Sequence, residues 1–168
     1  DEAQAAARPP IWGDDLPSRL LARAAWVEAE RGNLTEAIAQ MRKIVQEDPH
    51  FYGGWTNLAN WYRQSGDKEN YLKTAEVLNS LWPLEAVPMG YLGEARLWLG
   101  DRAGAREILR EAMQRFPDYD YGLETLFSME LEDNDRDAAA AVLAVLKRHA
   151  PPGPMSLSRD VRFAVKFE

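Results

Sequence analysis

Two apolar patterns of helical period follow one another in residues 52–83, which read YGGWTNLANWYRQSGDKENYLKTAEVLNSLWP. In each half the apolar positions are spaced three or four residues apart, as on one face of an amphipathic helix. They are Trp55, Leu58, Ala59 and Tyr62 in the first half, and Tyr71, Ala75, Leu78 and Leu81 in the second. Gly66 can end the first helix, Asp67 can cap the second, and Pro83 can stop it. The stretch therefore predicts a helical hairpin with a short turn.

The same landmarks recur along the chain at intervals of 34 residues. Closing prolines stand at Pro49, Pro83, Pro117 and Pro151. Inner turns are marked by Gly32, Gly66, Gly100 and Asn134, followed by the polar residues Asn33, Asp67, Asp101 and Asp135. The small residue of the second helix is Ala37, Ala105 or Ala139, with Tyr71 as the departure. This spacing predicts an N-terminal lead-in and four units, in residues 1–17, 18–51, 52–85, 86–119 and 120–153.

The pattern Trp55-x2-Leu58-Ala59-x2-Tyr62, followed by Gly66-Asp67, Ala75 and Pro83, resembles a tetratricopeptide repeat, whose period is also 34 residues. The resemblance covers residues 18–153. It implies an all-α, right-handed α-solenoid of four helical hairpins, each of which buries its apolar face against its neighbours. It also implies protein–protein binding and assembly, by analogy with the families that share this fold.

The packing positions of this frame predict the core. In the first helices they are Leu21, Ala24, Ala25, Trp55, Leu58, Ala59, Tyr62, Met89, Leu92, Gly93, Leu123, Leu126 and Phe127. In the second helices they are Ala37, Met41, Ile44, Tyr71, Ala75, Leu78, Ala105, Leu109, Ala112, Ala139, Leu143 and Leu146. We expect the tightest crossing where Gly93 faces Ala105. We also expect Tyr71, opposite Ala59, to splay its hairpin or tilt its ring outward. Trp12 is expected to cover the first unit or, alternatively, to contact a missing upstream repeat.

Two interpretations are open for residues 154–168. The alternation of Val161, Phe163, Val165 and Phe167 with polar or small residues is typical of a strand. The 34-residue frame instead places a capping helix, or half of a fifth repeat, in this stretch. Its packing positions would be Leu157, Val161 and Ala164, with Ser156 or Ser158 as N-cap. We favour a helix docked on the fourth unit over Leu143 and Leu146, because a lone strand would have no partner. The chain would then be a piece of a longer solenoid.

Composition restricts the function. The 168 residues are 46% hydrophobic, which is too apolar for a disordered chain. A net charge of −7 argues against nucleic acid or an anionic membrane as the main partner. The sequence has no apolar run long enough for membrane insertion. Cys is absent, which suits either the cytoplasm or the periplasm and therefore leaves the compartment open.

No constellation of residues predicts catalysis, a cofactor or a metal. His50 and His149 are far apart in sequence, and neither belongs to a pair with metal-ligand spacing. We therefore expect a protein that is not an enzyme.

One acidic stretch has the beginning of a calcium-binding pattern. Asp133, Asp135 and Asp137 alternate as at the start of a calcium loop. Such a loop would next need a Gly and then a Glu, and this chain has Ala138 and Ala144 in their places. The pattern therefore does not predict a calcium site.

The resemblance places certain first-helix positions on the inner, concave groove of the solenoid. They are Arg19, Arg23, Trp26, Asn57, Asn60, Arg63, Tyr91, Glu94, Trp98, Tyr121 and Glu124. Trp26 and Trp98 are either binding anchors or half-buried between neighbouring first helices. Asn57 and Asn60 could pair with a peptide backbone, because an amide both donates and accepts.

Three functional hypotheses follow. The first is a non-catalytic scaffold that binds a protein or extended peptide segment in the concave groove. The second is the repeat arm of a larger enzyme, such as a glycosyltransferase, or of a secretion or polysaccharide-export assembly. The third is self-association through the ends of the solenoid.

Overall fold

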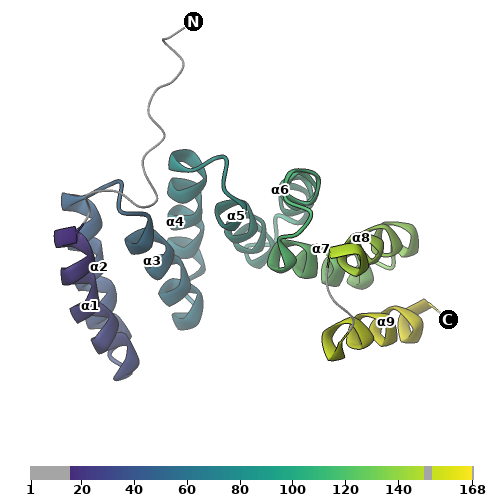
Figure 1. Ribbon diagram of the computed structural model, residues 1–168, viewed down its shortest axis with the longest axis horizontal. Helices are drawn as coiled ribbons and strands as arrows, with labels where there is room; N and C mark the ends of the chain where they lie inside the picture. Colours follow the sequence, from purple (N-terminus) through teal and green to yellow (C-terminus); the bar gives the residue numbers. More distant parts are fainter. Residues whose placement is uncertain (1–15, 150–152, 168) are drawn as a thin grey trace, which may run out of the picture. The chain divides into compact units, whose positions relative to one another are not determined.

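The computed structural model describes residues 16–149 and 153–167, and every regular element in these two ranges is an α-helix (Figure 1). The expectation for Trp12 falls outside the described residues. The chain divides into two compact units, Asp1–Pro88 and Met89–Glu168, which we call unit 1 and unit 2. The fold is an all-α helical repeat, as the 34-residue period predicts.

Unit 1 contains two helical hairpins. The helices are α1 (Leu16–Glu30), α2 (Leu34–Glu47), α3 (Tyr52–Ser65) and α4 (Lys68–Leu81). Helix α1 packs on α2 and α3 packs on α4, and α2 and α3 join the two hairpins. Helix α1 also touches α3, so the first helices of the two hairpins are neighbours.

Unit 2 holds most of α5 (Ala86–Trp98) and all of α6 (Arg102–Arg115), α7 (Asp120–Glu132), α8 (Arg136–His149) and α9 (Pro154–Phe167). Helix α7 packs on both α6 and α8, and α9 packs on α8. The helix expected for the tail is confirmed, and the strand interpretation is wrong. The expected serine caps are also wrong: α9 begins at Pro154, which suits a first helical position because its missing N–H would have no helical partner.

The inner turns have the predicted backbone geometry. Gly32, Gly66 and Gly100 have φ of 86°, 75° and 86°, and Asn134 takes the same left-handed region with φ 58°. Three aspartates cap the following helices by accepting hydrogen bonds from backbone N–H groups. Asp67 accepts from Asn70 at 3.1 Å, Asp101 from Gly104 at 2.9 Å, and Asp135 from Ala138 at 3.0 Å. Asn33 instead donates its side-chain N–H to Glu28 at 2.7 Å.

Most of the predicted core is buried, but the first helix departs from the pattern. Ala25 is fully buried, whereas Leu21 and Ala24 are exposed. The reason is that no helix precedes α1 in the described residues. In α3, the corresponding Leu58 is buried and lines a pocket together with residues of the preceding helix α2.

The two expectations about close helix packing have different outcomes. A side chain at Gly93 would place its Cβ 2.5 Å from Cγ of Leu109, so α5 and α6 do approach closely at this glycine. Leu109, rather than Ala105, is the residue that fills the space. Of the two alternatives for Tyr71, the outward tilt is wrong, because the residue is completely buried, and the splayed hairpin stays a prediction. An outward ring would have left a large apolar surface in water.

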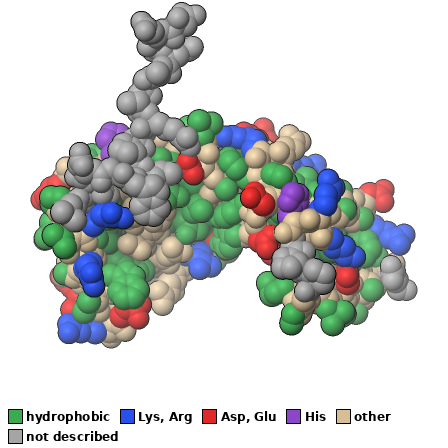
Figure 2. Space-filling view, viewed as in Figure 1, with side chains coloured by type: hydrophobic (Ala, Val, Ile, Leu, Met, Phe, Trp, Pro, Cys, Tyr) green, Lys and Arg blue, Asp and Glu red, His purple; other side chains and the backbone are tan. Residues whose placement is uncertain are grey.

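Helix α9 docks through a different face from the one expected. Phe163 and Phe167 pack against a cluster that includes the buried Leu143 and Leu146. Leu157 remains 66% exposed and Val161 52% exposed. In a complete repeat, these two positions of the first helix would pack against the second helix of the same hairpin. No helix follows α9 among the described residues, so the two side chains stay exposed. Figure 2 shows hydrophobic side chains on the surface over α9.

Candidate protein-binding surfaces

The described residues give no indication of a membrane span or a metal centre. No described helix is both long enough and apolar enough to cross a bilayer. No group of three or more His, Cys, Asp or Glu side chains in the same residues is arranged to hold a metal ion. The candidate sites among the described residues are surfaces and pockets within unit 1 and within unit 2.

The first-helix face of unit 1 is formed by α1 and α3. These two helices carry the predicted groove residues Arg19, Arg23, Trp26, Asn57, Asn60 and Arg63, the six residues by which we define this face. Trp26 is 51% exposed, so about half of this large side chain is open to a partner. Arg19, Arg23 and Arg63 are also exposed. The face therefore combines an accessible aromatic surface with cations.

The two asparagines of this face lie half-buried on α3. Asn60 donates its side-chain N–H to the backbone oxygen of Thr56 at 3.1 Å, one turn earlier in the same helix. Among the described residues, the amide oxygen of Asn60 and the whole amide of Asn57 make no hydrogen bond. These groups have the donor and acceptor capacity that an extended peptide backbone requires.

The predicted groove residues of unit 2 lie on α5 and α7, and several of them contact one another. The hydroxyl of Tyr121 donates to the carboxylate of Glu94. The ring of Tyr91 meets that of Tyr121 edge-on, with centroids 6.1 Å apart and planes at 87°. Trp98 is half-buried at the end of α5. The structure thus brings Tyr91, Glu94 and Tyr121 together in one cluster.

Glu124 has its partners on α9, a helix that was not included in the predicted groove. Its carboxylate accepts from the guanidinium of Arg159, which is only 3% exposed and also lies 3.6 Å from Asp120. Arg162 contributes a second cation 3.6 Å from Glu124 and donates to Ser128 at 2.8 Å. Burial of a cation requires such partners. Sequence reasoning missed both arginines, because it docked α9 through apolar positions alone.

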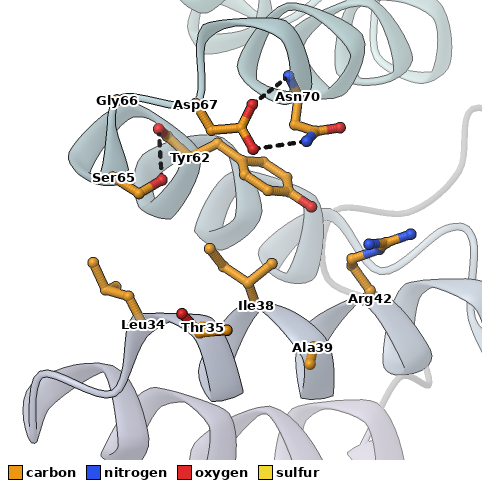
Figure 3. Close-up of a pocket in the computed structure, with 10 residues that line it drawn as sticks. All are labelled: Leu34, Thr35, Ile38, Ala39, Arg42, Tyr62, Ser65, Gly66, Asp67 and Asn70. Atoms are coloured by element: carbon orange, nitrogen blue, oxygen red, sulfur yellow. Dashed lines mark hydrogen bonds between the residues drawn. The ribbon is translucent and has the colours of Figure 1, made fainter.

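A groove in unit 1, the second-helix groove, lies between α2 and α4 and has α3 as its floor. It contains a cavity of about 520 Å³ and an adjoining one of about 270 Å³. Arg42, Tyr62 and Asn70 line both cavities. In Figure 3 the hydroxyl of Tyr62 points along the cavity toward Arg42. No sequence spacing indicated this groove, since its residues come from three helices.

Tyr62 has a perturbed environment. Only 7% of the residue is exposed. Burial raises the pKa of its hydroxyl, while the charge of Arg42 lowers it and that of Asp67 raises it. The neutral phenol is therefore the form present near neutral pH, and it can both donate and accept a hydrogen bond.

Comparisons with known proteins agree on the fold. A family model described as tetratricopeptide repeat matches residues 91–119. The crystal structure of MamA protein aligns with a TM-score of 0.76 at 15% identity, covering 89% of this chain and 80% of that one. A thermophilic TPR protein from Thermus thermophilus aligns with a TM-score of 0.67 at 22% identity, with the same coverages of 89% and 80%.

A third solved structure is described as a Podosopora anserina putative kinesin light chain with nearly identical TPR-like repeats. It aligns with a TM-score of 0.69 at 16% identity and covers 90% of this chain and 86% of that one. The comparison with curated proteins gives no significant match. At these identities the structural likeness concerns the fold. The chain therefore has the all-α fold of tetratricopeptide repeat proteins, and residues 91–119 match the repeat itself.

Proposed function

We propose that this protein is a non-catalytic scaffold that binds an extended peptide or protein segment on the first-helix face of unit 1. The tetratricopeptide fold suggests an interaction scaffold, and the first-helix face adds the chemistry of a peptide site. The observation that carries the proposal is the 51% exposure of Trp26 on a helix that neighbours α3. Large aromatic side chains are common anchors of protein interfaces.

The polar groups of α1 and α3 support an extended segment as the ligand. Asn57 and Asn60 lie on α3 and have hydrogen-bonding capacity that no described residue uses. Arg23, an exposed cation of α1, would favour a segment with acidic side chains or a free carboxylate. Glu94 and Glu124 in unit 2 bind Tyr121 and Arg159, whereas Asn57 and the amide oxygen of Asn60 make no hydrogen bond among the described residues, and we therefore place the peptide on unit 1.

A binding titration tests this proposal. Peptides selected by display against the whole chain would be titrated against the wild type, with an expected affinity in the roughly micromolar range of small, transient contacts. Trp26→Ala should weaken binding by about tenfold or more, because it removes the aromatic anchor. The double variant Asn57→Ala/Asn60→Ala should weaken it by about 1–3 kcal/mol if both amides pair with the peptide.

Leu84→Ala is the matched control, because Leu84 is also a large exposed apolar residue of unit 1 but lies outside α1 and α3. Its affinity should equal that of the wild type. Melting curves of all variants should coincide, since none of the substituted side chains is buried. Equal affinities for Trp26→Ala and Leu84→Ala would show that the peptide uses another surface.

A further inference from the structure

The second-helix groove is about as long as one short helix. The lining residues of α2 extend from Leu34 to Gln46, which corresponds to about 18 Å along a helix. The opposite wall is the part of α4 from Asn70 to Val77. Because the two cavities share three residues, they form one continuous groove between these walls.

The floor and the lower walls of this groove are largely apolar. Ile38 and Val45 of α2, Leu58 of α3 and Val77 of α4 line it. Leu58 and Val45 are buried, and Ile38 is half-buried. A partner helix could bury its own apolar residues against this surface, as in other complexes in which an amphipathic helix occupies a groove.

The rims of the groove are positively charged. Arg42 on α2 and Lys73 on α4 are both exposed, and neither makes a hydrogen bond or ion pair with any described residue. The acidic lining residue is Asp67, and both of its carboxylate oxygens accept hydrogen bonds from Asn70, at 3.1 and 2.7 Å. The groove therefore presents two available cations on a chain of net charge −7.

A polar group lines the same space. The hydroxyl of Tyr62 makes no hydrogen bond within the described part of the chain. An occupant that excludes water from the groove and accepts a hydrogen bond from this hydroxyl would gain affinity. A carboxylate near Arg42 could accept hydrogen bonds from both the guanidinium and this hydroxyl (Figure 3).

We propose that the second-helix groove docks an acidic amphipathic helix of a protein partner. The apolar residues of that helix pack on the half-buried Ile38 and Val77, and its carboxylates bind Arg42, Lys73 and the hydroxyl of Tyr62. The groove is formed by α2 and α4 over α3, and it uses none of the six residues of the first-helix face. It would therefore give the scaffold a second, independent docking site.

The test uses a synthetic helical peptide of about 14 residues, with Leu spaced three or four residues apart and Glu along one flank. A second peptide replaces every Glu by Gln. Binding to the whole chain is measured by fluorescence anisotropy, and NMR chemical shifts locate the site. We expect the Glu peptide to bind at least tenfold more tightly than the Gln peptide and to shift the signals of α2 and α4.

Two adjacent substitutions on α2 provide the sharpest contrast. Arg42→Glu should weaken binding of the Glu peptide at least tenfold, because Arg42 lines the groove. Lys43→Glu makes the same change in net charge at an exposed residue that lines neither cavity, and it should leave the affinity within about twofold. Tyr62→Phe should weaken binding about threefold. A peptide with Lys in place of Glu should bind the Arg42→Glu variant more tightly than it binds the wild-type protein.

Several results would overturn the proposal. One is failure of the Glu peptide to bind at all, and another is equal affinity of the Glu and Gln peptides. A third is an equal loss of affinity in Arg42→Glu and Lys43→Glu, and a fourth is NMR chemical-shift changes confined to α1 and α3. Each of these results would contradict docking in the second-helix groove. Displacement of the peptide by an equal concentration of benzoate would assign the groove to a small carboxylate instead. Trp26→Ala should have no effect on this peptide, so the two docking sites can fail or succeed separately.

Discussion

Leu109 occupies the space that a side chain at residue 93 would need. The glycine lets α5 and α6 approach, and a Cβ there would lie 2.5 Å from Cγ and 2.6 Å from Cδ2 of the leucine. Because Leu109 is itself almost completely buried, it has little room to move. One missing side chain in α5 thus sets how closely the two helices of this hairpin can pack.

Gly93→Ala should lower the free energy of unfolding by about 1–3 kcal/mol, the usual cost of inserting a methyl group into a filled core. The measurement is chemical denaturation followed by circular dichroism. Gly122→Ala is the matched control: it lies in α7, and its Cβ would stand 3.3 Å from the nearest atom, in the ring of Tyr119. That control should change the stability by less than about 1 kcal/mol. Equal losses in both variants would contradict the steric explanation.

Helix α9 illustrates how an element combines two kinds of interaction on one face. The rings of Phe163 and Phe167 contact each other at a tilt of 56°, with centroids 5.1 Å apart, and pack against the apolar cluster of α6, α7 and α8. Two ion pairs also join α9 to its neighbours. The buried guanidinium of Arg159 pairs with Glu124 of α7, and Asp160 of α9 lies 2.5 Å from Lys147 of α8. The opposite face is apolar as well, but it remains exposed at Leu157, Val161 and Val165.

Phe163→Ala should lower the free energy of unfolding by about 1–3 kcal/mol, since the ring is partly buried against the cluster. Val165→Ala, on the same helix and 83% exposed, should change it by less than about 0.5 kcal/mol. Thermal melting of the two variants beside the wild type provides the measurement. If both substitutions had the same small effect, α9 would not be a stabilising cap on α8.

At the scale of the whole molecule, each helix packs on helices close to it in sequence. Consecutive helices make most of the contacts within unit 1, and the same is true of α6 to α9 in unit 2. The exceptions join helices two apart in sequence: α1 touches α3, and Glu124 of α7 pairs with Arg159 of α9. In repeat proteins with this pattern, stability is approximately a sum of local terms, because few contacts connect distant parts of the chain. The effects of a core substitution should therefore be concentrated in its own unit.

Native-state hydrogen exchange can measure that localisation. Leu78→Ala in unit 1 and Leu146→Ala in unit 2 each remove a completely buried leucine, at an expected cost of about 2–5 kcal/mol. Leu78→Ala should accelerate exchange at least tenfold in α3 and α4 and much less in α7 and α8. Leu146→Ala should show the reverse pattern. A uniform acceleration in both units by either substitution would indicate a single cooperative unit instead.

The sequence by itself determined the helices, their turns and most of the core. Glycine or asparagine at a left-handed turn, aspartate at a cap and apolar spacing along a helix act over a few residues, so a local pattern can report them. The helix in residues 154–167 could also be predicted, because the 34-residue period places the first helix of a further repeat there.

Only the tertiary structure decided which apolar positions were covered and which surfaces were available. Leu21 and Leu157 follow the same pattern as buried leucines, yet both are exposed because no described helix faces them. The pairing of Glu124 with Arg159 and the second-helix groove with Tyr62 join residues from different helices. Burial and charge pairing depend on distances through space, and the sequence of one helix does not contain the position of the next.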